Sequence, residues 1–162
     1  MKTEKNNGPS SQQKKSSPIT NRFGTKKAVA IMVWFTNSQD QKFLMLTKRL
    51  TVPKFSGWYA AVGGSVEKGE CVIRAAQREM IEETEVYVGR DELKLIDCYT
   101  EDDFKCFIFE VYMGTYRFNE IKNAEPEKHS PWKLYTSEEA LKLPNLMPAV
   151  AEILLTNQQT SV

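Results

Sequence analysis

The sequence is poor in the residues that most often bind transition metals or act as nucleophiles. Its 162 residues include one histidine, His129, and three cysteines, none of them in a CxxC pair. This argues against a zinc ribbon, a site of several imidazoles, a disulfide framework and a Ser-His-Asp triad. We expect Cys71, Cys98 and Cys106, which lie in apolar-rich segments, to be buried, reduced thiols. We expect His129, within Glu-Pro-Glu-Lys-His-Ser-Pro, to be a surface loop residue.

Long hydrophobic runs are also missing. No stretch approaches the roughly 18 apolar residues that a membrane helix needs, and the N-terminus lacks the apolar segment and cleavage pattern of a secretory signal. With 41% hydrophobic and 27% charged residues, the composition is that of an ordinary soluble globular protein. The length fits one domain. We therefore expect a cytoplasmic protein with no membrane partner.

Acidic residues are nearly absent from the N-terminal end. Residues 1–27 hold 7 Lys and Arg against one acid, Glu4, which leaves 15 bases and 20 acids in residues 28–162. The net charge of +1 is thus the difference between a basic tail and an acidic body. Because residues 1–26 have almost no large apolar side chains, we expect a disordered basic tail there and a folded domain over 27–162. The acidic body disfavours direct binding to nucleic acid.

The hydrophobic pattern predicts an α/β (α+β) fold, a mixed sheet with helices on its faces. A hairpin is expected from residues 27–35 and 42–49, and a third strand over 57–62 that ends on Gly63-Gly64. Further strands are expected over 93–101, 104–113 and 132–135, and helices over 70–84, 137–143 and 147–156. The longest irregular stretch of the body, residues 119–131, has the length of a functional loop.

The helix expected over 70–84 carries carboxylates in the middle of its apolar face. At about 100° per residue, Glu79 and Glu83 project into this face and Glu82 lies at its edge. The apolar residues of the face are Val72, Ile73, Ala75, Ala76 and Met80. A merely solvated acidic run would lie on the opposite face, so the arrangement favours a cation site. Oxygen ligands without imidazoles or useful thiols indicate a hard divalent ion, Mg²⁺ or Mn²⁺.

The residues before this helix support the same interpretation. Gly63 and Gly64 would let the backbone bring a carbonyl or amide close to an ion or a phosphate, although a simple turn would also use them. Glu70, near the helix start, could reach Arg78 two turns on and fix the loop against the helix.

Residues 64–86, taken as one string, resemble the signature of the Nudix (MutT-type) hydrolases. The family pattern is Gly-x5-Glu-x7-Arg-Glu-apolar-x-Glu-Glu-x-Gly-apolar, and eight of its nine specified positions match here. The resemblance implies the Nudix fold, a mixed sheet sandwiched between helices. It also implies a Mg²⁺- or Mn²⁺-dependent enzyme that hydrolyses a nucleoside diphosphate linked to another moiety.

The resemblance also assigns roles to single residues. It implies that Glu79, Glu82 and Glu83 are catalytic metal ligands, that Gly63 adds a carbonyl ligand, and that Gly64, Glu70 and Arg78 are structural. Glu79 or Glu83 would also serve as the base for the attacking water. A further carboxylate from outside the motif is expected, and its candidates are Glu101, Asp102, Asp103, Glu125 and Glu127. One position departs from the pattern: Glu85 stands where the family has glycine, so we expect the helix to end with strain or to run on slightly.

The segment from Glu125 to the helix over 137–143 resembles the corresponding region of nucleoside-triphosphate pyrophosphohydrolases. This implies cleavage of a (deoxy)nucleoside triphosphate to the monophosphate and pyrophosphate. The candidate substrate-binding residues are Lys48 and Arg49 for phosphate, Trp34, Phe55 and Trp132 for the base, and Glu125. Trp132 could equally be a core residue of its short strand. The alternatives are another diphosphate substrate (a nucleotide sugar, a dinucleoside polyphosphate or capped RNA) and a non-catalytic nucleotide-binding module. A homodimer is compatible with the sequence.

Overall fold

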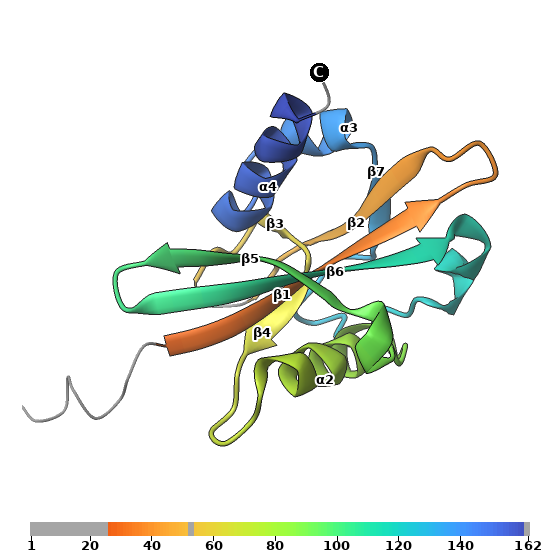
Figure 1. Cartoon of the computed structure of the whole chain (residues 1–162). Coiled ribbons are helices and arrows are strands. Elements are labelled where there is room, and N and C mark those ends of the chain that lie inside the picture. The colour runs from red at the N-terminus through yellow and green to blue at the C-terminus, as the bar shows by residue number, and fades with distance from the viewer. Residues whose placement is uncertain (1–25, 52–53, 161–162) are drawn as a thin grey trace, which may run out of the picture.

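A mixed seven-stranded sheet with helices on both faces forms the centre of the protein (Figure 1). The computed structural model describes residues 26–51 and 54–160, so the expected tail lies outside it except for Lys26, which already belongs to the first strand. The strands are β1 (Lys26–Thr36), β2 (Lys42–Lys48), β3 (Tyr59–Ala60), β4 (Val62–Ser65), β5 (Lys94–Glu101), β6 (Phe104–Gly114) and β7 (Lys133–Tyr135). The helices are α2 (Val72–Thr84), α3 (Ser137–Leu141) and α4 (Pro148–Gln159), with 3₁₀ turns at Arg90–Glu92 and Thr115–Glu120.

Strand β1 organises the sheet. It pairs antiparallel with β2, which confirms the expected hairpin, and parallel with β6 over its whole length, within the order β3-β2-β1-β6-β5. The parallel pair makes the sheet mixed. The expected strand over 57–62 is divided into β3 and β4, and the glycine pair lies inside β4 instead of after it. There Gly63 and Gly64 face Ala30 and Val29 of β1.

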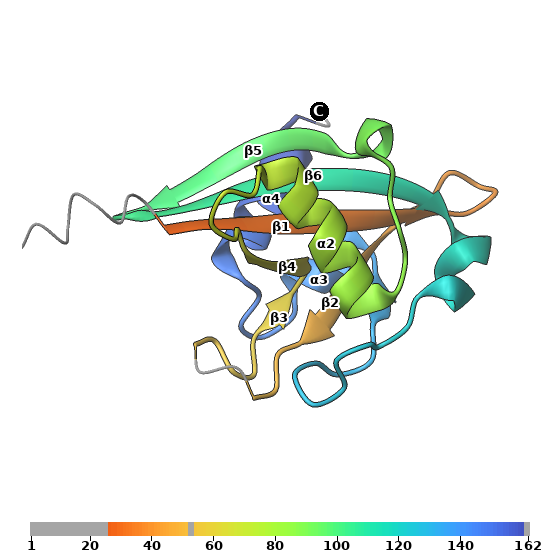
Figure 2. The same cartoon turned by 90° about the horizontal axis from the view of Figure 1, so that it is seen from below.

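Two apolar cores lie on the two faces of the sheet, because successive side chains of a strand point to opposite faces. From β1, Val33 and Phe35 contribute to the core beneath α2, whereas Met32 and Trp34 contribute to the core beneath α3 and α4. Figure 2 shows α2 lying across the strands on its own side, away from α4. Since both faces of β1 are covered, the strand is a continuous apolar run rather than an alternating one.

The cysteines correct one sequence-based expectation. All three are free thiols, but only Cys106 is buried, whereas Cys71 and Cys98 are exposed. Cys98 lies on β5, an edge strand with mostly exposed residues, which the apolar character of the segment does not reveal. Burial raises the pKa of the Cys106 thiol to about 12.

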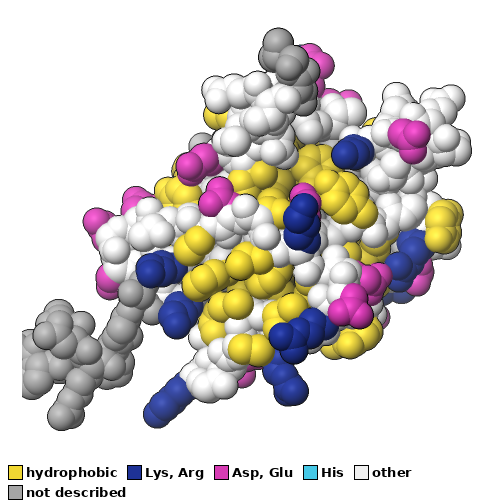
Figure 3. Space-filling view, in the orientation of Figure 1, with side chains coloured by type: hydrophobic (Ala, Val, Ile, Leu, Met, Phe, Trp, Pro, Cys, Tyr) yellow, Lys and Arg dark blue, Asp and Glu magenta, His cyan; other side chains and the backbone are white. Residues whose placement is uncertain are grey.

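The surface carries both charges. In the view of Figure 3, hydrophobic side chains gather over the middle of the face, and basic and acidic side chains are scattered around them. One exposed apolar side chain is Leu95 of β5. Among the described residues, no helix is both long and apolar enough to span a membrane.

Candidate active site

Helix α2 holds two carboxylates against the sheet. On the face of α2 that packs on the sheet, Ala75, Ala76 and Met80 are fully buried. Glu79 and Glu83, one turn apart on this face, are only 7% and 4% exposed. Burial raises the pKa of Glu79. Burial also raises the pKa of Glu83 well above its usual range, and the charges of Glu79 and Glu125 raise it further. Two neighbouring buried carboxylates resist ionisation together unless a cation balances them.

The glycine pair makes room for this arrangement. A Cβ atom at Gly64 would lie within 2.8 Å of all three carboxyl atoms of Glu79. A Cβ atom at Gly63 would overlap the carbonyl oxygen of Val29 and lie 3.2 Å from the Cα atom of Ala30. The two glycines therefore have different tasks: Gly63 allows β4 to approach β1, and Gly64 leaves space for the Glu79 carboxylate.

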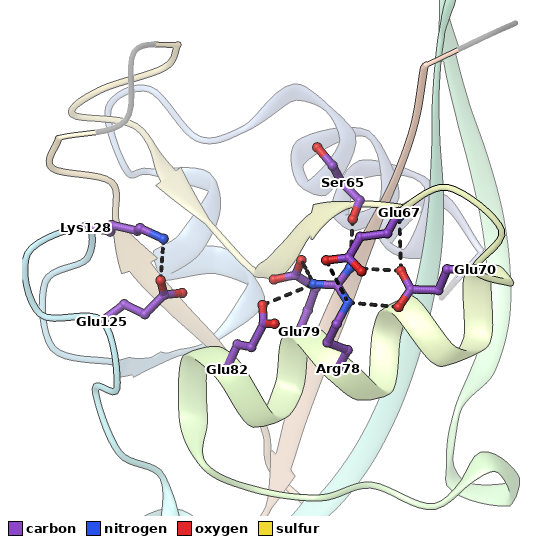
Figure 4. A network of polar contacts seen from close by, with 8 residues as sticks. All are labelled: Ser65, Glu67, Glu70, Arg78, Glu79, Glu82, Glu125 and Lys128. Atoms are coloured by element: carbon purple, nitrogen blue, oxygen red, sulfur yellow. Dashed lines mark hydrogen bonds and ion pairs between the residues drawn. The ribbon is translucent and has the colours of Figure 1, made fainter. Parts of the chain in front are cut away.

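Arg78 joins the loop before α2 to the carboxylates (Figure 4). Its guanidinium donates to both carboxyl oxygens of Glu70, at 2.8 and 2.9 Å, and to the carbonyl oxygen of Ser65 at 2.9 Å. Its Nη1 donates to Glu79 at 2.8 Å and to Glu82 at 3.1 Å. The bonds from Arg78 lower the pKa of Glu70. The side chain of Arg78 thus reaches over the edge of the site.

The end of α2 is strained at the position where the motif departs from the family. Glu85 is the C-cap and adopts a left-handed conformation with φ 58° and ψ 20°, and its N–H donates to the carbonyl oxygen of Ile81. The helix therefore ends at Thr84 as the family pattern requires, with a residue that disfavours this backbone conformation. The expected strain is confirmed.

The stretch 119–131, of which the first two residues belong to the 3₁₀ turn Thr115–Glu120, is bonded to the C-terminal end of α2. The N–H groups of Lys122 and Ala124 donate to the carbonyl oxygens of Thr84 and Glu83, at 3.0 and 3.2 Å. The Glu83 carbonyl also accepts the indole N–H of Trp132 at 3.3 Å. Carbonyls that a helix end leaves without partners thus position the segment.

The far side of the same segment is fastened to the end of β2. The N–H of Leu50 donates to the backbone carbonyl of Lys128 at 2.8 Å, and the hydroxyl of Thr51 donates to the carbonyl of Glu127 at 2.6 Å. Arg49 and His129 form an antiparallel bridge. Residues 125–129 are therefore held between two elements that are far from them in the sequence.

This arrangement places Glu125 and His129 beside Glu83. One potential ligand atom from each of the three residues lies within 4.8 Å of the other two. Glu83 Oε2 and His129 Nδ1 are buried without a hydrogen-bond partner within the part of the chain that the structure describes. Buried polar atoms normally have partners, so the donor set of these three residues fits a divalent metal, which would also offset the carboxylate charge.

Glu125 is the outside carboxylate that the structure brings to the motif. Of the other candidates, Glu101, Asp102 and Asp103 lie at the exposed turn between β5 and β6, and Glu127 is exposed. Glu125 also forms an ion pair with Lys128 at the rim of the site.

His129 is the residue that the sequence interpretation missed. It is 8% exposed, which contradicts the expected surface position. Its segment is polar and rich in charges, so no local pattern indicates burial, and only the bonds to β2 and α2 draw it inward. Burial lowers the pKa of its imidazole.

The structure brings only some of the expected substrate-binding residues to the site. Arg49 lies beside the site: burial lowers its pKa, the charge of Glu83 opposes this, and its Nε is buried without a partner among the described residues. Lys48 is exposed, and Phe55, half-buried, packs edge-on against Trp58 in the loop after β2.

The two tryptophans proposed for the base are core residues. Trp132 is 6% exposed, donates its indole N–H to the Glu83 carbonyl and lies with its ring beside the imidazole of His129. Trp34 is 4% exposed in the core beneath α3 and α4, which corrects its expected place at a base pocket: alternation along β1 turns it to the sheet face opposite α2.

A family model, the NUDIX domain, matches residues 26–156 of the chain. The chain belongs to the Nudix family. The matched residues begin with β1 and end within α4.

Similar proteins agree with this assignment. Dihydroneopterin triphosphate diphosphatase of Escherichia coli (strain K12) is 38% identical over 82 residues, which are 51% of this chain and 52% of that protein. The match therefore spans about half the length of this curated relative.

Solved structures show the same fold. The MutT protein from Methanosarcina mazei Go1 superposes with a TM-score of 0.65 at 16% identity, over 86% of this chain and 97% of that chain. The Nudix domain of Shewanella oneidensis NrtR, complexed with ADP ribose, superposes with a TM-score of 0.66 at 15% identity, over 83% and 88% of the two chains. At these identities the likeness concerns the fold alone, and it bears out the expected mixed sheet between helices.

Proposed function

We propose that the protein is a divalent-metal-dependent Nudix pyrophosphohydrolase that cleaves a (deoxy)nucleoside triphosphate and water into the monophosphate and pyrophosphate. The observation that carries the proposal is the convergence of Glu79 and Glu83 on α2 with Glu125 from the distant segment. The retained carboxylate set argues against a non-catalytic binding module.

The roles of the chain's own residues follow from their positions. We assign the metal to Glu79, Glu82, Glu83 and the Gly63 carbonyl, as the motif implies, with Glu125 added by the fold. When bound, Mg²⁺ or Mn²⁺ would neutralise phosphate charge and lower the pKa of a water molecule. Glu83 or Glu79, held nearly out of solvent, would accept the proton of the attacking water. Arg49, beside the site, would contact a phosphate oxygen of the substrate.

The supporting residues hold this arrangement in place. Arg78 holds the loop that contains Glu67 and Glu70 against helix α2 through its bidentate bond to Glu70. Gly64 leaves Glu79 room to take its position. Both effects are preorganisation, since they fix carboxylates before a substrate arrives.

A pterin triphosphate is a second candidate substrate. It is favoured by the 38% identity to dihydroneopterin triphosphate diphosphatase, although that match covers half of each chain. It would use the same chemistry at the triphosphate with a different heterocycle. Both candidates predict pyrophosphate as one product.

A substrate panel with product detection tests the proposal. The full chain is incubated in Mg²⁺ or Mn²⁺ with the nucleoside and deoxynucleoside triphosphates, dihydroneopterin triphosphate, ADP-ribose, a nucleotide sugar, a dinucleoside tetraphosphate and capped RNA. We expect pyrophosphate and a monophosphate from a triphosphate. Preferred release from another member would replace the substrate proposed. Binding of a nucleotide without turnover in any divalent metal would indicate a binding module.

The Glu125→Gln variant, with Glu127→Gln as its matched control, tests the convergence itself. Both residues come from the same segment, but only Glu125 lies beside Glu83. We expect Glu125→Gln to lower kcat by at least about tenfold and Glu127→Gln to leave it unchanged. Equal activities in the two variants would contradict a role for Glu125.

A cytoplasmic location and a homodimer remain predictions of the sequence.

A further inference from the structure

His129 is the only histidine of the chain, and the fold buries it beside two carboxylates. Its backbone is fixed on several sides. The N–H donates to the Glu125 carbonyl at 3.0 Å, the carbonyl accepts the side-chain amide of Asn123 at 2.9 Å, and the residue bridges to Arg49. Such anchoring determines where the imidazole lies with respect to Glu83 and Glu125.

A packing role alone explains this imidazole poorly. The ring lies 6.1 Å from that of Trp132, centroid to centroid, with an interplanar angle of 32°. The contact would suit an apolar or aromatic side chain equally well. His129 instead leaves Nδ1 buried without a hydrogen-bond partner in the described chain, which is unfavourable when nothing compensates the lost hydration.

A second orphaned atom lies in the same cluster. Glu83 Oε2 is also buried without a partner within the described residues, and Glu83 is 4% exposed. The cations nearby do not complete the cluster: Lys128 pairs with Glu125 from the exposed side, and the Arg49 Nε is itself without a partner in the described part of the chain. One ion bound by oxygen and nitrogen donors would complete the cluster, because potential ligand atoms of Glu83, Glu125 and His129 lie within 4.8 Å of one another.

We propose that His129 is a ligand of a divalent metal held together with Glu83 and Glu125, and that this nitrogen ligand makes the site prefer Mn²⁺ to Mg²⁺. The proposal rests on the proposed function in that the metal belongs to the same active site. Mg²⁺ prefers oxygen donors in octahedral geometry, whereas first-row transition ions accept imidazole nitrogen readily. An imidazole among the carboxylates therefore adds more affinity for Mn²⁺ than for Mg²⁺.

Pulsed electron paramagnetic resonance tests the ligand directly. The full chain, free of any histidine tag, is loaded with substoichiometric Mn²⁺ in the absence of substrate. We expect nitrogen modulation typical of a coordinated imidazole. Because the chain has one histidine, this signal can come only from His129. A spectrum of bound Mn²⁺ without imidazole modulation would overturn the proposal, and this outcome depends on no variant.

Metal affinities test the selectivity. We expect His129→Gln to weaken Mn²⁺ binding at least about tenfold and Mg²⁺ binding, measured by competition, less than threefold. The control Glu127→Gln should change neither. Equal losses for both ions would mean that His129 only supports the fold of the segment, and unchanged Mn²⁺ affinity would exclude it as a ligand. Circular dichroism establishes that the variants are folded.

These measurements are separable from the test of the proposed function. Imidazole-bound Mn²⁺ in a protein that hydrolyses no diphosphate would overturn the function and leave the ligand assignment intact. Turnover in a protein whose bound Mn²⁺ lacks the imidazole signal would do the reverse.

Discussion

The carboxylate of Glu79 occupies the space that a side chain at Gly64 would need: a Cβ atom on Gly64 would lie within 2.8 Å of all three carboxyl atoms of Glu79. The neighbouring Gly63 has a different constraint, because a Cβ atom there would overlap the backbone of Val29. Gly64 makes room for a side-chain carboxylate, which can move, whereas Gly63 makes room for the backbone of a neighbouring strand, which cannot. Substituting them should therefore have different effects.

Gly64→Ala should lower kcat by on the order of tenfold or more, because Glu79 must leave its position and small misplacements of catalytic groups are costly. It should leave stability little changed, since a flexible side chain can move aside. Gly63→Ala should lower the free energy of unfolding by about 1–3 kcal/mol, because backbone atoms cannot move freely. Thermal unfolding and steady-state kinetics on both variants check this. A similar balance of stability and activity losses in the two would refute the distinction.

Glu83→Gln should lower kcat by about 10²–10⁴, even in saturating Mg²⁺ or Mn²⁺. The amide keeps the shape of the carboxylate but cannot take a proton from water or balance a cation with its charge. Steady-state kinetics with the best substrate of the panel measures the loss, and Glu127→Gln is the control. Full turnover in Glu83→Gln would refute the proposed mechanism.

The same substitution should stabilise the metal-free protein at neutral pH. The pKa of Glu83 is raised in the folded state by burial and by Glu79 and Glu125. The folded state therefore holds this proton more tightly, so stability falls as pH rises above the ordinary Glu pKa of about 4.3. In chelator at pH 7, Glu83→Gln should therefore unfold at a higher temperature than the unsubstituted protein, as thermal unfolding can measure. The difference should vanish near pH 4. A gain that grows towards low pH would contradict this sign.

Glu85→Gly should stabilise the protein by about 0.5–1 kcal/mol. Glu85 ends α2 with a positive φ of 58°, a conformation that glycine adopts without strain. The matched control is Glu85→Ala, which removes the same charge but keeps the strain. Chemical denaturation should rank glycine above alanine. Equal stability of the two variants would show that the helix end is not strained, and kcat should be unchanged in both.

Arg78→Lys should lower kcat on the order of tenfold, because an ammonium cannot make the paired bonds to Glu70 together with those to Glu79 and the Ser65 carbonyl. A double-mutant cycle with Glu70→Gln checks that the two residues act together. We expect a coupling of about 1 kcal/mol in stability and smaller than additive losses of kcat. Strictly additive losses would show that Arg78 acts without Glu70.

The local sequence pattern was sufficient to predict the fold class and those residues of the site that lie in the motif of residues 64–86. A 3.6-residue period determines which side chains share a helix face, so the inward position of Glu79 and Glu83 follows from the sequence alone. The strained end of α2 at Glu85 follows as well, because backbone preference is a property of the residue type. The hairpin of β1 and β2 was also predictable, because its two strands are adjacent in the sequence.

Tertiary structure decided what depends on contacts between distant segments. Five carboxylates were candidates to complete the site, and the bonds from residues 122–124 to the end of α2 bring Glu125 there. The same segment buries His129, although its surroundings in the sequence are polar. Trp34 is buried because α3 and α4, which are distant in the sequence, cover the face of the sheet opposite α2. No local period encodes such contacts, since each depends on which elements meet after the chain has folded.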